Sequence, residues 1–499
     1  MDVKAPDHIG FAGDYNCEHI FLHNHYGVVI DIKNMVQELN VYESIYKNAL
    51  TGSIVIVDAQ NLITKLEIQG LERISFTIST PGTTDSRDII NASQESGHPF
   101  HVYKITDRKQ VQPGILLYTL HFGSREFMRN LRTKVSQAYD GRLDRAVYAM
   151  FLDENYLDSK KTLTFEPCGN SDKIVIPNMR PFDAINMIAR KALPEKSNGV
   201  GYYFYETTKG YNFRSWENMV TTEGKFRRKT KQVFYYMPVN ITDSENIDNK
   251  IEHEYKSVED YRFINNFHDI AANTAMGTYG HRVLTHNLYD KSFATDDYNY
   301  HTSFAETKHT DFTTSQFDTE KYVVGESDTD ETPADTQRQT SKVSDYPESR
   351  VSVQSTTQYL HNDKAGAGYG LDVLEDGRKL GQAIAQSAQV IQGTCLKLII
   401  KGQSYIEAGD LIEFKMRAVD EKNPDGEEDP QYSGNYVVTK VRHQINATKY
   451  VMVLECAKDS VKTGYSKLNK KIPRNKNIAT LRDTYIEEKG DTFGGNTSI

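Results

Sequence analysis

Cysteine and histidine gather near the start of the chain at spacings that would suit a metal ion. The residues are Cys17, His19, His23 and His25. All four have odd numbers, so a β-strand would direct their side chains to one face. One thiolate with imidazoles is a ligand set typical of zinc. We favour surface or interface histidines without a ligand, expect no bound cofactor, and keep these four residues as the metal candidates to check.

Neighbouring carboxylates are the second arrangement that could do chemistry. Asp153 and Glu154, and likewise Glu427 and Glu428, are of the type that glycosidases use in pairs. Adjacent charges in polar loops are normally solvated, which is the interpretation we favour. The loop from Asp420 to Asp429 is acidic, but it lacks the spacing of a calcium-binding EF-hand. The sequence contains no P-loop, no H-E-x-x-H and no G-x-S-x-G motif. We therefore predict a protein that is not an enzyme.

The composition limits the class of protein. At 499 residues, two to four domains are expected. The 31 Tyr and 21 Phe favour sheet-rich structure, because aromatic rings suit a pleated, half-buried face. A net charge of -9 argues against stable nucleic-acid binding, and no apolar run is long enough to span a membrane. The N-terminus lacks the pattern of a signal peptide. The four scattered cysteines are typical of reduced thiols in a chain made in the cytosol.

Short strands are expected in two separate parts of the chain. Between residues 28 and 122, β-branched and alternating runs are divided by Gly, Pro and Asp, as in a small barrel or sandwich. Between residues 394 and 456, four alternating runs form a meander. Gly409 and Asp410 supply a structural turn within that meander. We expect these two parts to be similar β-barrels.

Helical spacing predicts the elements between the two barrels. Apolar residues four apart predict an αα-hairpin or bent helix over 124–155, and a second helix begins at Pro181, a residue favoured in the first helical turn. The runs 202–206 and 211–215 predict a β-hairpin. A further helix is expected to begin near Ser257. The segment around 325–333 is too acidic and polar to order itself by burial.

These patterns divide the chain into eight parts. They are an N-terminal arm (1–27), a first β-barrel (28–122), a helical connection (123–160), a mixed α/β domain (161–243), a helical segment (244–292), an acidic polar insertion (293–365), a helix with a second β-barrel (366–460) and a C-terminal arm (461–499). The predicted fold class is therefore α+β and β-rich. It has two similar small barrels, helical and mixed insertions between them, a long polar insertion and a C-terminal arm.

Four motifs in this order resemble the central baseplate hub of contractile-tailed, T-even-like phages. They lie at residues 179–189, 202–215, 261–267 and 398–414. A looser similarity extends to the N-terminal part of type VI secretion spike proteins. The resemblance covers about residues 28–290 and 370–456, and it includes neither the acidic insertion nor the C-terminal arm.

The resemblance implies a structural, non-enzymatic role. A hub is a homotrimeric ring that adapts the sixfold tail tube to a threefold central spike and becomes part of the DNA conduit. The implied partners are the tail tube protein, a separate spike protein and neighbouring baseplate wedge proteins. The implied location is the virion tail, assembled in the host cytoplasm. The alternatives are a tail-associated cell-wall hydrolase or another structural component of the baseplate, such as a wedge protein.

Overall fold

We analysed a computed structural model of the chain. It describes residues 11–82, 88–94, 96–221, 232–236, 247–264, 269–288, 291–311, 314–315, 343–356, 377–417, 428–429 and 431–462. The acidic core of the predicted insertion and nearly all of the predicted C-terminal arm lie outside these residues, as do Asp420 and Glu427. No helix in the described part of the chain is long and apolar enough to cross a membrane.

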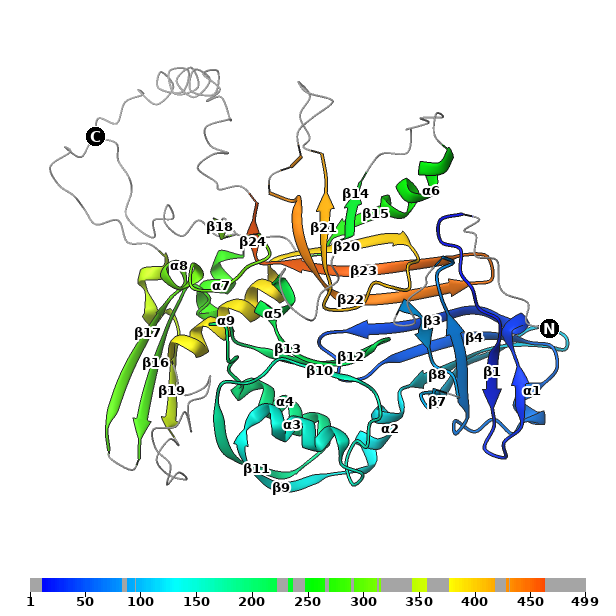
Figure 1. Ribbon diagram of the computed structural model, residues 1–499, viewed down its shortest axis with the longest axis horizontal. Helices are drawn as coiled ribbons and strands as arrows, with labels where there is room; N and C mark the ends of the chain where they lie inside the picture. The colour runs from blue at the N-terminus through cyan, green and yellow to red at the C-terminus, as the bar shows by residue number, and fades with distance from the viewer. Residues whose placement is uncertain are drawn as a thin grey trace, which may run out of the picture.

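One large sheet joins strands from the N-terminal part of the chain with strands from its C-terminal part (Figure 1). Its described strands are β1 (Ile20–His23), β2 (Val29–Asp31), β3 (Val36–Ser44), β4 (Thr51–Asp58), β5 (Arg73–Ile78), β6 (Ile90–Asn91), β7 (Phe100–Gln112), β8 (Ile115–Gly123), β14 (Gln232–Tyr235), β15 (Val258–Phe263), β20 (Thr394–Lys401), β21 (Leu411–Lys415), β22 (Gly434–Asn446) and β23 (Tyr450–Lys458). Their main order is β15-β20-β23-β22-β3-β4-β8-β7-β5-β1-β2. Short helical turns η1 (Lys33–Met35) and α1 (Leu62–Lys65) lie between its first strands.

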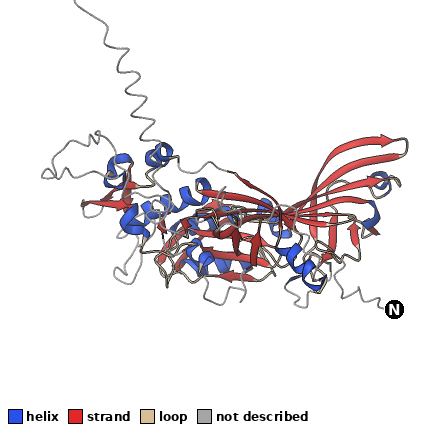
Figure 2. Cartoon of the chain, turned by 90° about the horizontal axis from the view of Figure 1, so that it is seen from above, coloured by secondary structure: helices blue, strands red, loops and turns tan. Residues whose placement is uncertain are grey.

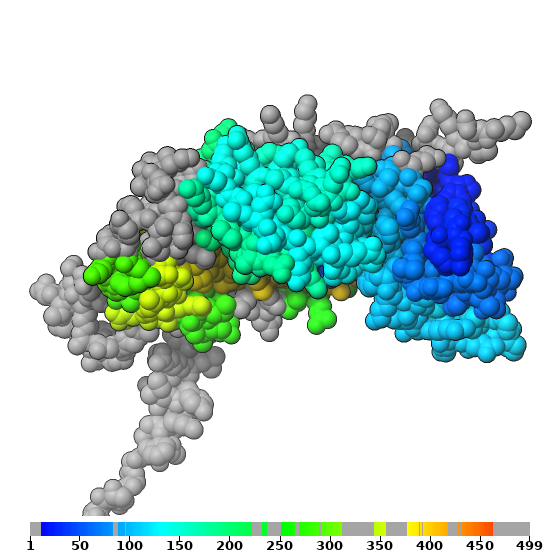
Figure 3. Space-filling view, turned by 90° about the horizontal axis from the view of Figure 1, so that it is seen from below, coloured from blue at the N-terminus to red at the C-terminus, as the bar shows by residue number. Residues whose placement is uncertain are grey.

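A second unit packs beside this sheet and forms a rounded mass in the space-filling view (Figure 3). Its elements are α2 (Arg125–Arg132), β9 (Val135–Arg142), α3 (Leu143–Leu152), β10 (Leu163–Phe165), β11 (Ser171–Met179), α4 (Pro181–Lys191), β12 (Tyr202–Thr207), β13 (Gly210–Ser215) and α5 (Trp216–Val220). It has its own core, in which Phe151, Ile185 and Phe213 are fully buried. The predicted helix at Pro181 and the predicted hairpin at 202–215 are confirmed.

A third layer covers one end of the molecule, where α9 lies along a three-stranded sheet (Figure 1). The elements of this region are α7 (Ile270–Met276), β16 (Gly280–Asn287), β17 (Phe293–Asn299), α8 (Tyr300–Phe304), η3 (Val343–Asp345), η4 (Pro347–Ser349), β19 (Val351–Thr356) and α9 (Gly377–Gln392), with the short pair β18 (Thr314–Ser315) and β24 (Ser460–Val461). Helix α6 (Ile247–Lys256) instead packs against β14 and β20 of the large sheet. A Cβ on Gly381 would lie 2.4 Å from Tyr298, so glycine allows α9 to approach β17. Seen from above, the strands run along the length of the molecule and helices pack beside them (Figure 2).

The α+β, β-rich class is confirmed, but two local expectations are wrong. Residues 135–142 form β9 within the expected αα-hairpin, because they pair with β11. The expected helix after Ser257 is strand β15, because it pairs with β20 and buries Val258. In both segments long-range pairing overrides short apolar spacings that fit a helix.

The strands expected in two barrels share one sheet instead of closing separately. Within the described residues this sheet runs openly from β15 to β2. The reason lies in β22, which is 13 residues long. Its first residues pair with β21, whereas Lys440–Asn446 pair with β3 from the other predicted barrel. Strand β22 therefore does not close a barrel of its own and instead links the two predicted barrels through its pairing with β3.

The two halves of the large sheet nevertheless repeat one topology. The N-terminal unit pairs its strands as β3-β4-β8-β7-β5. The C-terminal unit pairs its strands as β15-β20-β23-β22-β21. Each unit follows the same order along the chain, and all eight pairings are antiparallel. The N-terminal unit and the C-terminal unit are thus two sets of five strands with one topology.

Two β-bulges coincide between the units and align β3 with β15, and β7 with β22 as far as Thr106. Two further bulges of β7, between Thr106 and Lys109 and between Gln110 and Gln112, have no counterpart in β22. In β3 a bulge falls between Val36 and Glu38, and in β15 the corresponding bulge falls between Val258 and Asp260. A second bulge falls between Val102 and Lys104 of β7 and between Val438 and Lys440 of β22. Because a bulge inserts a residue at one defined position, two matching bulges show that the units are related in register as well as in strand order.

Candidate functional site: the seam between the two units

The antiparallel pairing of β3 with β22 is called the seam. It joins Glu38–Ser44 to Lys440–Asn446, so segments about 400 residues apart in sequence lie side by side. On one face, the Arg442 guanidinium donates to the Asn40 side-chain oxygen (2.8 Å) and to Glu38 (2.9 Å). This half-exposed ion pair contributes modestly to stability and favours one register.

On the opposite face of the seam, Glu43 and His443 form a fully buried pair. His443 Nε2 lies 3.5 Å from Glu43 Oε1, and its Nδ1 lies 2.6 Å from the Tyr450 hydroxyl. Glu43 also accepts hydrogen bonds from the backbone N–H groups of Thr208 and Ala408, both at 2.8 Å. Burial alone would raise the pKa of Glu43, but His443 and the two N–H donors hold that pKa below its ordinary value. Glu43 therefore ties the β12–β13 hairpin and the turn before β21 to the seam.

The predicted structural turn lies beside this pair. Gly409 has a φ of +90°, and its N–H donates to Val438 of β22 at 2.8 Å. A Cβ at this position would lie 2.2 Å from the Tyr205 hydroxyl, so both conformation and space require glycine. The Asp410 side chain accepts a hydrogen bond from the Glu407 N–H, which closes the turn. Gly409 and Asp410 thus position the start of β21 against β22.

The four metal candidates have separate partners. His19 Nδ1 lies 2.6 Å from Asp31, and His23 Nε2 lies 2.7 Å from the Ser75 hydroxyl. The rings of His25 and Tyr26 are tilted against each other, with their centroids 3.9 Å apart. Burial raises the pKa of Cys17 to about 11, which disfavours the thiolate that a metal requires. Within the described residues, no three metal-ligating side chains form a group that could hold an ion.

The carboxylates considered for hydrolysis have structural contacts. Asp153 ends α3 and accepts the Asn155 N–H, and the backbone carbonyl of Glu154 accepts from Arg129. Glu428 lies 2.9 Å from Lys415 and 3.1 Å from Lys462. None of these groups lines either of two cavities in the described residues, one beside Trp216 and the other beside Glu206.

A buried charge cluster that sequence reasoning missed lies beside a cavity of about 220 Å³. Lys161 bridges Glu126 (2.9 Å) and Glu206 (2.5 Å). Burial raises the pKa of Glu206, as a catalytic acid would need. However, its second oxygen accepts from the Leu50 N–H and from the Tyr211 hydroxyl. Both oxygens are therefore occupied by protein groups, and the cluster joins the middle unit to the start of β4.

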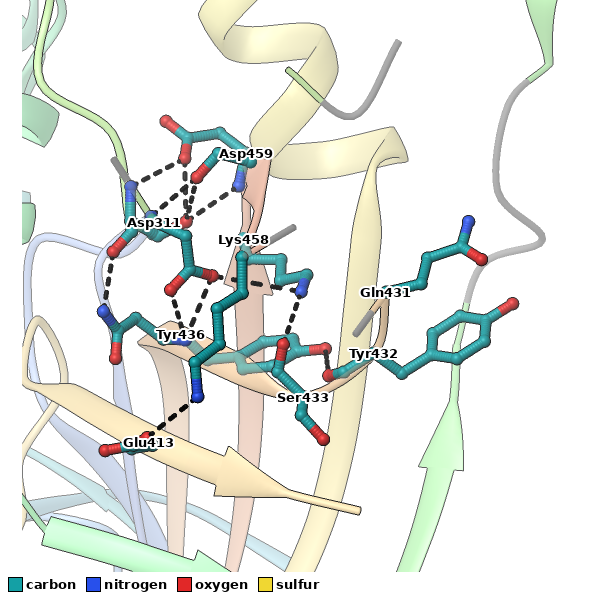
Figure 4. Close-up of polar contacts among 12 residues, drawn as sticks. Asp311, Glu413, Gln431, Tyr432, Ser433, Tyr436, Lys458 and Asp459 are labelled. Carbon is teal, nitrogen blue, oxygen red and sulfur yellow. Dashed lines mark hydrogen bonds and ion pairs between the residues drawn. The ribbon is translucent and has the colours of Figure 1, made fainter. Parts of the chain in front are cut away.

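A second buried cluster closes the C-terminal unit (Figure 4). Lys458 donates to the Ser433 carbonyl at 3.1 Å and lies 4.0 Å from Asp311. Next to it, Asp459 accepts from the Trp216 indole and from the Thr310 N–H. Burial lowers the pKa of Lys458 to about 8. Only the fold brings these residues together, because they come from three distant parts of the chain.

Comparison with known proteins gives structural likeness without a close relative. No family model matches the sequence, and no curated protein matches it. A tail protein from Neisseria meningitidis MC58 has 10% identity over 89% of this chain and 97% of its own, with a TM-score of 0.44. The 43 kDa tail protein of prophage MuSo2 from Shewanella oneidensis has 7% identity over 88% and 98%, with a TM-score of 0.45. A type VI secretion system component from E. coli has 8% identity over 86% and 75%, with a TM-score of 0.37.

Proposed function

We propose that this chain is the structural hub of a contractile phage tail baseplate. Three copies form a ring that carries the sixfold tail tube on one face and a separate threefold spike on the other. After contraction the ring is part of the DNA conduit. The protein acts mechanically in the virion tail, contacts neighbouring wedge proteins, and is assembled in the host cytoplasm.

The observation that carries this proposal is the internal repeat. The N-terminal and C-terminal units share strand order and two bulge positions. A threefold ring of such chains contains six related units, so it can offer six similar docking sites to a sixfold tube. A chain with one such unit would offer only three. The repeat therefore supplies what a symmetry adaptor needs.

The choice of a hub over a wedge component depends on threefold assembly. Light scattering of the purified full chain is expected to give three times the chain mass of 56.9 kDa. Class averages from electron microscopy are expected to show a threefold ring with six similar lobes. A stable monomer at micromolar concentration, even with the spike protein present, would rule out the hub.

A further inference from the structure

The alignment of the two units identifies a strand edge that has a partner in one unit and lacks one in the other. In β22, residues Lys440–Asn446 pair with β3 to make the seam. The corresponding residues of β7 begin at Lys104, directly after the shared bulge. The first residues of β7 pair with β5. From Lys104 to Gln112, no described strand pairs with the outer edge of β7.

A complementary edge lies at the other end of the sheet. Strand β15 corresponds to β3, which gives its outer edge to the seam. The described strand order ends at β15, whose ladder partner is β20 on its inner side. An isolated bridge joins Ser257 to Tyr235 before β15 begins, and it leaves the outer edge from Asp260 onward without a described strand. The distal edge of β7 therefore corresponds to the β22 side of the seam, and the outer edge of β15 corresponds to its β3 side.

Burial differs between the two units at these same positions. In the seam, Asn40 and Val41 are 3% and 0% exposed. Their counterparts on β15 are Arg262, which is exposed, and Phe263, which is half-buried. On the β7 side Ile105 is half-buried, whereas its counterpart Val441 on the seam strand β22 is buried. The residues that the seam buries in one pair of strands remain accessible in the other.

We propose that the outer edge of β15 in one copy pairs antiparallel with the distal half of β7 in a second copy, and so repeats the seam between subunits. In the seam, Arg442 lies opposite Tyr42. The alignment places Thr106 at the position of Arg442 and Ile264 at the position of Tyr42. Thr106 of one copy should therefore lie opposite the partner copy's residue Ile264.

This pairing rests on the proposed trimer and adds its contacts. Each copy gives one edge of each kind, so the contact is head-to-tail and must either close into a ring or continue as a chain of subunits. Exposed strand edges are prone to pair with other strands, which favours a copy of the same sheet as occupant.

Cysteine cross-linking of the full chain tests the pairing. The variant combines Thr106→Cys with Ile264→Cys in a chain that also carries Cys395→Thr. Cys395 is replaced because it lies next to Ile264, whose N–H donates to the Cys395 carbonyl. Threonine is chosen because Thr51 occupies the equivalent position in the N-terminal unit. The matched control is Tyr42→Cys with Arg442→Cys in the same background. Its pair lies at the equivalent position within one chain. A short bis-maleimide reagent spans directly opposite residues in either case, since their Cα atoms are about 4.5–5.5 Å apart.

The expected result is a covalent trimer on a denaturing gel for the test variant and a cross-linked monomer for the control. Each single-cysteine variant should stay at its background level. If light scattering shows a trimer but the test variant gives no covalent oligomer while the control reacts, the proposed pairing is wrong and the hub proposal stands. Covalent ladders beyond three chains would support the pairing and overturn the closed trimer. Monomers without cross-links at every concentration would overturn both.

Discussion

One pair of facing core residues has its small and large side chains exchanged between the two units. Gly52 on β4 lies opposite Phe122 on β8. The equivalent positions in the C-terminal unit are Leu396 and Cys456. One unit therefore pairs a small residue with a large one, and the other unit reverses the order. Because core volume is conserved across the pair, both units keep a closely packed interior.

Gly52→Ala should destabilise the protein through overpacking. A Cβ at this position would lie 2.3 Å from the Phe122 ring and 2.4 Å from the Asn40 carbonyl oxygen, and the backbone of β3 cannot move without disturbing the seam. We expect a loss of about 1–3 kcal/mol in the free energy of unfolding, measured by urea denaturation. The control is Thr51→Ala, at the half-buried neighbouring position. Equal stability of Gly52→Ala and the wild type would contradict this packing.

Lys458 provides a prediction about pH. Burial lowers its pKa to about 8, whereas the ordinary value is 10.5. The folded state therefore binds fewer protons than the unfolded state between these pH values, so this residue's contribution to stability improves as pH rises from about 8 to above 10. Lys458→Met removes the effect, and the wild type should gain roughly 3 kcal/mol relative to the variant across that range. Chemical denaturation at pH 7 and pH 10.5 measures the difference, and parallel profiles for the two proteins would refute the assignment.

At the scale of elements, local patterns succeeded where one segment determines its own structure. Helix α4 has proline at its start, Arg190 and Lys191 in its last turn and a continuous buried stripe, and it begins at the predicted residue. The prediction for the segment that forms β15 was wrong, because six residues are too few to distinguish a helical spacing from an alternating one. Its pairing with β20, about 140 residues further along the chain, decides the outcome.

Glu43→Gln should weaken the junction of the seam with the elements that cover it. The variant loses the charge that faces His443 and one acceptor for the N–H groups of Thr208 and Ala408. We expect about 2–4 kcal/mol of destabilisation at pH 7, because breaking a buried pair leaves the other partner uncompensated. Since the pKa of Glu43 is lowered in the folded state, the gap to the wild type should shrink as pH falls below about 4. The half-exposed control Glu38→Gln should cost no more than about 1 kcal/mol. A gap that is constant with pH would exclude ionised Glu43 as its cause.

At the scale of the whole molecule, the sequence indicates two sets of strands but not how they join. Nothing in the residues around Glu38 or Arg442 indicates that they meet, because the two strands are separated by most of the chain. The charge clusters at Lys161 and Lys458 are hidden for the same reason. A buried lysine looks like a surface lysine until its partners, drawn from distant segments, are known. The seam itself could not be predicted from the sequence. The one related signal was the expected similarity of the two predicted barrels.

The full chain should not hydrolyse peptidoglycan. Glu206, a carboxylate with a raised pKa beside a cavity, has both oxygens occupied by Lys161, the Leu50 N–H and the Tyr211 hydroxyl. No group is left to protonate a glycosidic oxygen there. Turbidity of purified cell walls should stay constant with the wild type. Clearing by the wild type that is lost in Glu206→Gln, with the variant still folded by circular dichroism, would require the hydrolase alternative.

The full chain should also fail to retain duplex DNA at physiological salt. Non-specific binding to DNA depends on basic surfaces that release counterions, and this chain has 68 acidic residues against 59 Lys and Arg. A conduit of such charge would let DNA pass without holding it. Gel-shift experiments with a short duplex should give a dissociation constant weaker than about 10⁻⁵ M at 150 mM salt. Lys104, Arg108 and Lys109 on β7 are the basic residues that could bind DNA if this edge is accessible. The matched variant therefore replaces all three with Gln. Tight binding by the trimeric wild type that this variant loses would show that the β7 edge is accessible in the ring, against both the conduit and the proposed pairing between subunits.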